Sequence, residues 1–367
     1  MLRGIVAALT LGLASAACDD LLVVLGCNST EPSSGTSDAS APSDTPPSCQ
    51  AAGPGMTNCG GGSESCCTSL TVPGGSYNRT FTNDGSGPAG EADPATVATF
   101  RLDKYLVTVG RFRQFVTAWD GGAGWTPGAG AGKHTHLNCG NGLAGTDGGY
   151  EPGWVPGDDS NVTSNITPTD GGLACGVNDY EFLPQLAANS IYDTWTPQPG
   201  AQESLPINCV NWYTAYAFCI WDGGFLPSEA EWKYAAVGGS EELEYPWGST
   251  DPGTSSQYAI YGCYYPSGTG SCTGAGNIAP VGTPLLGASR WGHLDIAGSL
   301  FEWNLDWYAA AYVSPCTDCA YLTTATQRVT LGGNFDAPAV YFPPKRRYDN
   351  PLDSDAYAYG IRCARTP

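Results

Sequence analysis

Basic residues are scarce in this chain of 367 residues. Lys and Arg together number 15 against 35 Asp and Glu, which gives a formal net charge of −20 and a pI of about 4.2. Binding to nucleic acid or to an anionic membrane surface depends on clustered basic side chains. The composition therefore argues against nucleic acid as a partner, and we expect most of the acidic side chains only to solvate the surface.

Long apolar runs are missing as well. No segment approaches the roughly 20 consecutive apolar residues that a transmembrane helix needs. A short apolar run at residues 4–13 follows a basic residue and precedes small residues at 15–17. This pattern is typical of an export signal over residues 1–17. Cys18 comes next, which favours a lipoprotein anchored to a membrane through lipid on Cys18. The alternative is a secreted protein without lipid.

Histidine is rare too, with three residues in the chain. No Ser-His-Asp arrangement, phosphate-binding loop or nicotinamide-binding fingerprint is visible. His134 and His136 lie near Cys139, but two ligands are weak evidence for a metal site, and a polar loop is the simpler interpretation.

Glycine, proline and cysteine are abundant, with 50, 28 and 15 residues. Gly and Pro predict a chain dominated by loops, and cysteines in an exported protein predict disulfides. Three pairs are expected from their positions: Cys316 with Cys319, Cys263 with Cys272, and Cys139 with Cys209. The first forms a C-x-x-C, but zinc would need a second such pair, which the chain lacks.

Residues 18–65 are interpreted as a flexible tether. Ser, Thr, Pro, Gly and Asp dominate positions 28–62, and such a stretch cannot bury enough apolar surface to fold. Residues 66–367 are long enough for one large domain. Four cysteines could pin the tether to this domain: Cys49, Cys59, Cys66 and Cys67.

Three segments of this domain combine apolar side chains with a capping residue and are predicted to be helices: 109–119 after Thr108, 212–222 after Asn211, and 229–236 after Ser228. Ser228 and Glu231 form a capping box. Five segments are predicted to be strands: 69–72, 98–102, 278–281, 328–332 and 358–363. This mixture predicts an irregular α+β domain.

The order of the aromatic motifs carries the most information. They are VPGGSY (72–77), FRLDKYLVTVGRFRQFV (100–116), PINCVNWYTAYAFC (206–219), GGFLPSEAEWKYAA (223–236), GHLDIAGSLFEWNLDWY (292–308), RVTLGGNF (328–335) and YGIRCAR (359–365). The series resembles the formylglycine-generating enzyme family, also called sulfatase-modifying factor domains. The resemblance implies a loop-rich α+β fold related to the C-type lectin fold, over about residues 66–365.

The catalytic residues of the family do not carry over. Its active members use two cysteines after a Gly-Gly-Ser turn to bind copper and oxidise a substrate cysteine. Ala337 and Phe342 stand at those positions here, and Asn334 replaces the serine. Neither Ala nor Phe ligates monovalent copper, which prefers thiolates. The resemblance therefore implies no copper and no formylglycine generation.

Other family features are implied to persist. The resemblance pairs Cys219 with Cys363. It also implies a calcium site built from three carbonyls and one carboxylate: Ala297, Gly298, Leu300 and Glu302. Hard oxygen ligands of this kind suit calcium. The alternative is that Glu302 makes only a local hydrogen bond or salt bridge.

Two functional hypotheses are consistent with these features. In the first, the protein is a non-catalytic binding or structural module whose loops contact a peptide, a glycan or a protein. The candidate contact residues are aromatic: Tyr264, Tyr265, Trp307 and Tyr308. In the second, it is an oxidoreductase or other enzyme of the family with altered chemistry. Its candidate pocket residues are polar or charged: Asn334, Asp336, Lys345, Arg346 and Arg347.

Overall fold

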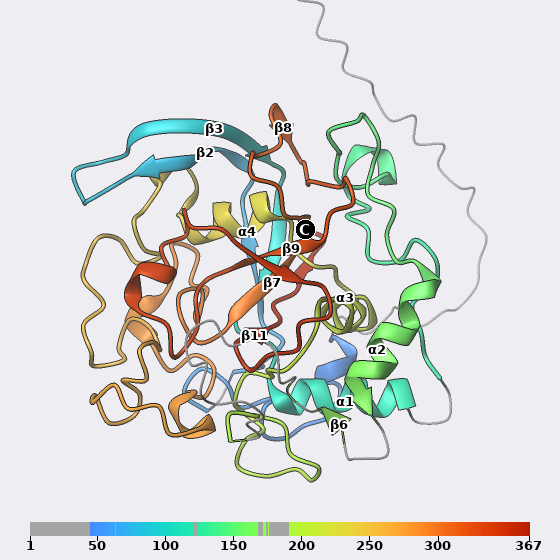
Figure 1. Ribbon diagram of the computed structural model, residues 1–367, viewed down its shortest axis with the longest axis vertical. Helices are drawn as coiled ribbons and strands as arrows, with labels where there is room; N and C mark the ends of the chain where they lie inside the picture. The colour runs from blue at the N-terminus through green and yellow to red at the C-terminus, as the bar shows by residue number, and fades with distance from the viewer. Residues whose placement is uncertain (1–44, 63, 121–123, 168–171, 174, 176–190) are drawn as a thin grey trace, which may run out of the picture. The chain divides into compact units, whose positions relative to one another are not determined.

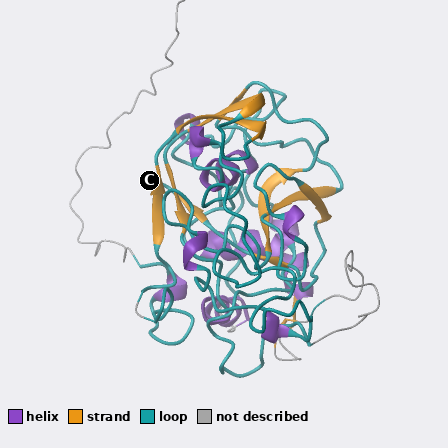
Figure 2. Ribbon diagram, turned by 90° about the vertical axis from the view of Figure 1, so that its left-hand side faces the viewer, coloured by secondary structure: helices purple, strands orange, loops and turns teal. Residues whose placement is uncertain are grey.

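The computed structural model describes residues 45–62, 64–120, 124–167, 172–173, 175 and 191–367. Short helices and small sheets are set among long loops (Figures 1 and 2). Within these ranges no helix has both the length and the apolar character required to span a bilayer. The architecture is the α+β mixture that the sequence predicts.

The strands in the described part of the chain form four small sheets. The largest has the order β10-β9-β7-β11, in which β7 (Phe301–Trp307) pairs antiparallel with β9 (Gln327–Leu331) and parallel with β11 (Tyr359–Gly360), and β10 (Tyr348–Pro351) pairs antiparallel with β9. A second sheet has the order β1-β4-β12, from Ser69–Val72, Phe100–Asp103 and Ala364–Arg365. A third joins β2 (Gly75–Thr82), β3 (Ala89–Val97) and β8 (Cys316–Thr317). The fourth pairs β5 (Ile166–Thr167) with β6 (Gly172–Leu173).

The α-helices are α1 (Val109–Asp120), α2 (Asp159–Asn165), α3 (Trp212–Trp221) and α4 (Glu229–Ala236). Short 3-10 turns also occur: Pro47–Cys49, Asn138–Gly140, Pro156–Asp158, Gly239–Glu241, Ala275–Asn277, Leu285–Gly287 and Ala339–Tyr341. The predicted caps are present. The Asn211 side chain accepts a bond of 2.9 Å from the backbone N–H of Thr214, and Ser228 and Glu231 form the reciprocal capping box. Each cap satisfies amides that the first helical turn leaves without partners.

The predicted flexible tether is wrong for residues 45–65. Disulfides join Cys49 to Cys67 and Cys59 to Cys66, and Ser48 is fully buried with its backbone N–H 3.0 Å from Oδ1 of Asp222. These bonds take the place of the apolar burial that the composition of the segment does not provide.

Two further sequence predictions fail. Residues 278–281 form no strand, because Ile278, Ala279 and Val281 are buried in the core from a loop. Their apolar character reflects burial rather than strand pairing. Cys209 is bonded to Cys175 and not to Cys139, since the fold brings together residues 34 apart in sequence. The other two positional pairs, Cys263–Cys272 and Cys316–Cys319, are present.

The pair that the family resemblance implies, Cys219–Cys363, is present with an Sγ–Sγ distance of 2.04 Å. It links the end of α3 to the residue before β12, across 144 residues of sequence. Both cysteines are completely buried. This bond therefore closes a large part of the domain into one covalent loop.

We expect the double variant Cys219→Ala/Cys363→Ala to unfold at a lower urea concentration than Cys263→Ala/Cys272→Ala. The second bond spans only 9 residues, and the loop-entropy relation gives roughly 2 kcal/mol more stabilisation for the longer loop. Peptide mapping under non-reducing conditions checks the pairing itself. Equal losses of stability, or a different partner for Cys219, would contradict the assignment.

Candidate functional site

The loop after β9 holds the two positions that the sequence assigned to the catalytic cysteines of the family. Gly333 has a φ of +75°, and a Cβ there would lie 2.9 Å from Cβ of Phe342, so the turn depends on glycine. Ala337 is fully buried, and its carbonyl accepts a bond of 3.0 Å from the N–H of Gly262.

Phe342 is also buried, and three aromatic rings pack around it: Tyr245, Trp247 and Tyr261, with ring centroids at 5.8, 6.4 and 5.1 Å. The place of a thiolate pair is thus filled by apolar packing. A copper ion does not fit these residues, because neither side chain has a donor atom.

Asn334 and Asp336 bond to each other. Nδ2 of Asn334 donates to one Asp336 oxygen at 2.5 Å, and the hydroxyl of Tyr357 donates to the other at 2.6 Å. Burial raises the pKa of Asp336 above its ordinary value. Tyr192 and Phe335 pack against Tyr357, with centroids 4.9 and 5.7 Å away. Asn334, Asp336 and Tyr357 are thus joined by hydrogen bonds, while the buried hydroxyl of Tyr192 has no partner among the residues described.

The basic residues of the predicted pocket point to other partners. Arg347 makes two bonds to the Glu229 carboxylate, at 2.6 and 2.8 Å, and Lys345 pairs with Glu244 at 2.9 Å. Arg346 is exposed. Asn334, Asp336 and Arg347 thus have internal partners, and one pocket formed by them with Arg346 stays a prediction. Long side chains near one another in sequence are drawn to separate carboxylates, which the sequence alone does not reveal.

The predicted calcium ligand Glu302 is buried against cationic and N–H groups. Its carboxylate accepts from Nε and Nη2 of Arg362 at 2.9 Å and from Nε1 of Trp232 at 2.6 Å. A calcium ion would have to replace this ion pair, so the set of Ala297, Gly298, Leu300 and Glu302 does not fit calcium as the residues lie here. Gly298 serves the turn itself, since a Cβ there would meet the Ile260 carbonyl at 2.3 Å.

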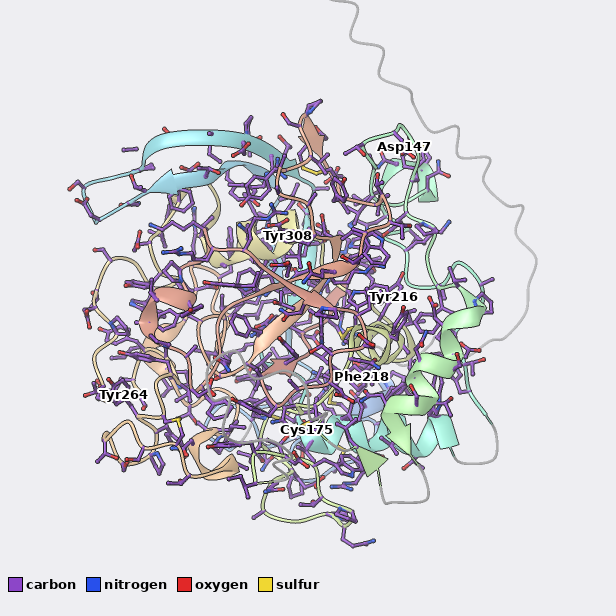
Figure 3. The ribbon with its side chains drawn as sticks, viewed as in Figure 1. Asp147, Cys175, Tyr216, Phe218, Tyr264 and Tyr308 are labelled. Atoms are coloured by element: carbon purple, nitrogen blue, oxygen red, sulfur yellow. A yellow bond between two sulfur atoms is a disulfide. The ribbon has the colours of Figure 1, made fainter. Side chains whose placement is uncertain are left out.

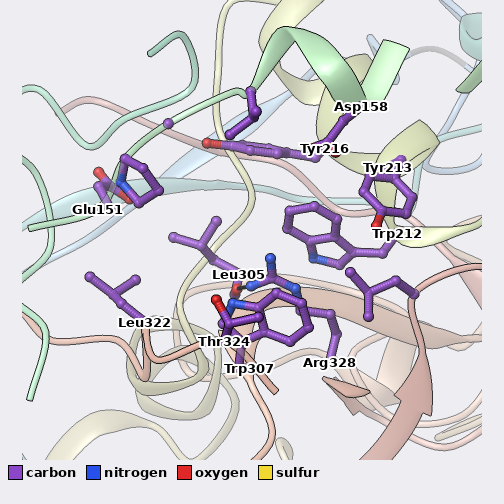
Figure 4. A pocket seen from close by; sticks show the side chains of 14 residues that line it. Glu151, Asp158, Trp212, Tyr213, Tyr216, Leu305, Trp307, Leu322, Thr324 and Arg328 are labelled. Atoms are coloured by element: carbon purple, nitrogen blue, oxygen red, sulfur yellow. Dashed lines mark hydrogen bonds between the residues drawn. The ribbon is translucent and has the colours of Figure 1, made fainter. Parts of the chain in front are cut away.

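A different pocket lies where α3 faces β7 and β9, with a volume of about 210 Å³ (Figure 4). Aromatic side chains provide much of its lining: Trp212, Tyr213, Tyr216 and Trp307. Leucines complete the apolar wall: Leu305, Leu322 and Leu352. Three charged side chains border it: Arg328, Asp158 and Glu151.

Arg328 is held between two tryptophans. The β7–β9 register sets it opposite Trp307, and its Cζ lies 3.7 Å from the Trp307 ring centroid and 3.8 Å from that of Trp212. Nη1 donates to the Leu305 carbonyl. Arg328 is 8% exposed, and its Nε has no hydrogen-bond partner among the residues described. Burial lowers the pKa of Arg328 to about 9, so the guanidinium stays charged at neutral pH.

Glu151 reaches the pocket from an ion network behind it. His134 lies between two carboxylates, with Nδ1 3.0 Å from Glu151 and Nε2 3.0 Å from Glu231. Burial alone would lower the pKa of His134, but the two carboxylates raise it to about 10. His134 is thus a buried cation with two acidic partners, and the sequence interpretation of a polar loop misses this role.

Most residues of this pocket were not predicted from the sequence. Of its lining, only Trp307 was named as a candidate contact, and it is half-buried. The other candidates, Tyr264, Tyr265 and Tyr308, are partly buried and lie outside this pocket (Figure 3 labels Tyr264 and Tyr308). Trp212 was predicted to begin a helix and Arg328 to begin a strand, and neither was named as a binding residue. The pattern that could have indicated the pocket is an arginine in one motif and a tryptophan in each of two others, because a guanidinium binds the face of a tryptophan ring.

Comparison with known proteins agrees with this fold. A family model described as "sulfatase-modifying factor enzyme 1-like domain" matches residues 60–367. The chain belongs to this family. The match begins within the folded segment that the sequence assigned to the tether, which agrees with the packing of residues 45–65.

Relatives and solved structures support the assignment. The formylglycine-generating enzyme of Thermomonospora curvata is 30% identical over 321 residues, covering 81% of this chain and 93% of that protein. The "inactive C-alpha-formylglycine-generating enzyme 2" of Bos taurus is 31% identical over 171 residues, 46% of this chain and 53% of that protein. The structure of PvdO from Pseudomonas aeruginosa superposes with a TM-score of 0.50 at 18% identity, covering 86% of this chain and all of that one. It shares the fold.

Calcium titration tests the environment of Glu302. We expect calcium and a chelator to give the same melting temperature. Glu302→Gln is expected to cost about 3–5 kcal/mol under both conditions, because it leaves Arg362 buried beside a neutral amide. Glu241→Gln is the matched control, since its ion pair with Arg290 is exposed and contributes at most about 1 kcal/mol. A rise in melting temperature with calcium that Glu302→Gln abolishes would restore the calcium site.

Proposed function

We propose that this protein is a non-catalytic binding module of the sulfatase-modifying factor family. The observation that carries the proposal is that Ala337 and Phe342, both buried, stand at the two cysteine positions, and that Phe342 packs among apolar side chains. A bovine relative named as inactive is consistent with loss of catalysis in this family. The altered-enzyme alternative gains no support, because Asn334, Asp336 and Arg347 are occupied by internal partners.

The module is proposed to act outside the cytoplasm, attached to a membrane through lipid on Cys18. Support comes from the sequence pattern at residues 1–17, which is typical of an export signal, and from six disulfides among the described residues, which suit an oxidising compartment. In this arrangement the domain presents its loops, as C-type lectin-related domains do, to a peptide, glycan or protein ligand.

An oxidation assay tests the loss of catalysis. The purified protein, given monovalent copper, oxygen and a cysteine-containing peptide, is expected to yield no formylglycine above a control without enzyme, because no thiolate pair holds the copper. The Thermomonospora curvata enzyme, run in parallel, shows that the assay works. Product formed at a rate above the control, followed by mass spectrometry, would overturn the proposal.

Expression in a bacterial host tests the anchor. The protein is expected to partition with membranes and to carry lipid on Cys18, as intact mass and fractionation report. Cys18→Ala is expected to release the protein or stop its processing, because the thioether to lipid no longer forms. Recovery of wild-type protein that begins with an unmodified Cys18 in the soluble fraction would leave plain secretion as the explanation.

A further inference from the structure

We propose that the pocket between α3 and the β7–β9 pair binds a monocarboxylate attached to an apolar group, with Arg328 as its anchor. The inference rests on the proposed function, because it names the ligand class of the binding module. It does not depend on the loop that holds Ala337 and Phe342.

The first argument is the charge of Arg328. Three other buried arginines bind carboxylates: Arg111 pairs with Asp103 and Asp222, Arg362 with Glu302, and Arg365 with Asp103 and Asp222. A fourth, Arg79, instead donates from Nε and Nη2 to two backbone carbonyls, whereas Arg328 bonds one carbonyl through Nη1 alone. Arg328 makes no ion pair within the described part of the chain, although it is 8% exposed. A buried cation without a carboxylate costs free energy that a bound anion would recover.

The second argument is the shape of the unpaired edge. The two tryptophans cover both faces of the guanidinium, and Nη1 is bonded to the Leu305 carbonyl. Neither Nε nor Nη2 forms a hydrogen bond with any residue that the structure describes. The Nε–Nη2 edge is the fork that binds the two oxygens of a carboxylate in parallel. Figure 4 shows the guanidinium directed into the pocket between Trp212 and Leu305.

The third argument concerns the rest of the ligand. Trp212, Tyr216 and Leu305 offer apolar walls to a group attached to the carboxylate. A volume of about 210 Å³ is below the roughly 300–1,000 Å³ of pockets that hold drug-sized ligands, so the group is about one ring in size.

The charge of the ligand is limited by nearby acids. Asp158 lines the pocket. The negative charges of Asp158 and Asp306 both interact with the Arg328 guanidinium. Glu151 also borders the pocket, although the positive charge of His134 offsets the negative charge of its carboxylate. One cation with acidic neighbours favours a single negative charge over the two of a phosphate monoester.

Isothermal titration of the full-length protein with benzoate, benzamide and phenyl phosphate tests the proposal. Benzoate is expected to bind at least tenfold more tightly than benzamide, which has the same shape without the charge, and more tightly than phenyl phosphate. Arg328→Met is expected to weaken benzoate at least tenfold, and Arg328→Lys several-fold, since a lysine keeps the charge but loses the fork. N-acetyl-Gly-Phe and its C-terminal amide then distinguish a peptide terminus from a free small acid as the source of the carboxylate.

Two variants keep the test decisive if Arg328→Met does not fold. Leu322→Trp fills the pocket while leaving Arg328 intact, and it should abolish benzoate binding with the far-UV circular dichroism and the cooperative urea transition retained. Arg290→Met removes an exposed arginine that does not line the pocket and should leave binding unchanged.

Equal affinity for benzoate and benzamide, or no binding by the folded wild type, would overturn the carboxylate site. Either result leaves the non-catalytic assignment standing, because that assignment fails only if formylglycine is produced.

Discussion

Four buried charges hold the ends of the domain together. Arg111 on α1 and Arg365 on β12 each contact both Asp103 and Asp222, at N–O distances of 2.6–3.1 Å, and three of the four side chains have no exposure at all. Such charges are stable in a low dielectric only as a complete set. The network therefore requires β4, α1, the end of α3 and β12 to meet, and the β1-β4-β12 sheet, the Cys219–Cys363 bond and the N-terminal turn around Ser48 are all arranged beside it.

The sequence predicts local contacts, but it does not predict contacts between residues distant along the chain, such as those of this network. Local chemistry was predictable: Asn211 and Ser228 cap their helices as expected, because a cap needs only residues three positions away. Motif order revealed the family and the Cys219–Cys363 pair. Partners distant in sequence were not predictable, as the bond from Cys209 to Cys175 shows.

The candidate site shows this limit most clearly. Asn334, Asp336, Arg346 and Arg347 were grouped because they lie close together along the chain, yet their partners are Tyr357, Glu229 and solvent. The pocket instead joins Trp212 on α3 with Trp307 and Arg328 on paired strands. The register of β7 and β9, which shifts between Trp303 and Trp307, sets Trp307 opposite Arg328. The sequence does not reveal this register. The loop that holds Ala337 and Phe342 and the pocket where a ligand is proposed are thus separate parts of the fold.

The two disulfides before β1 also have a mechanical consequence. Cys49–Cys67 and Cys59–Cys66 fasten the segment that precedes the first strand. In a lipid-anchored protein, any pull on the domain from the membrane enters through the N-terminal stretch and reaches Cys49 first. Covalent bonds carry that force to Cys67, two residues before β1, so the segment between Cys49 and Cys67 is shielded from being peeled away. A reductant would remove this protection and leave the same tension acting on hydrogen bonds alone.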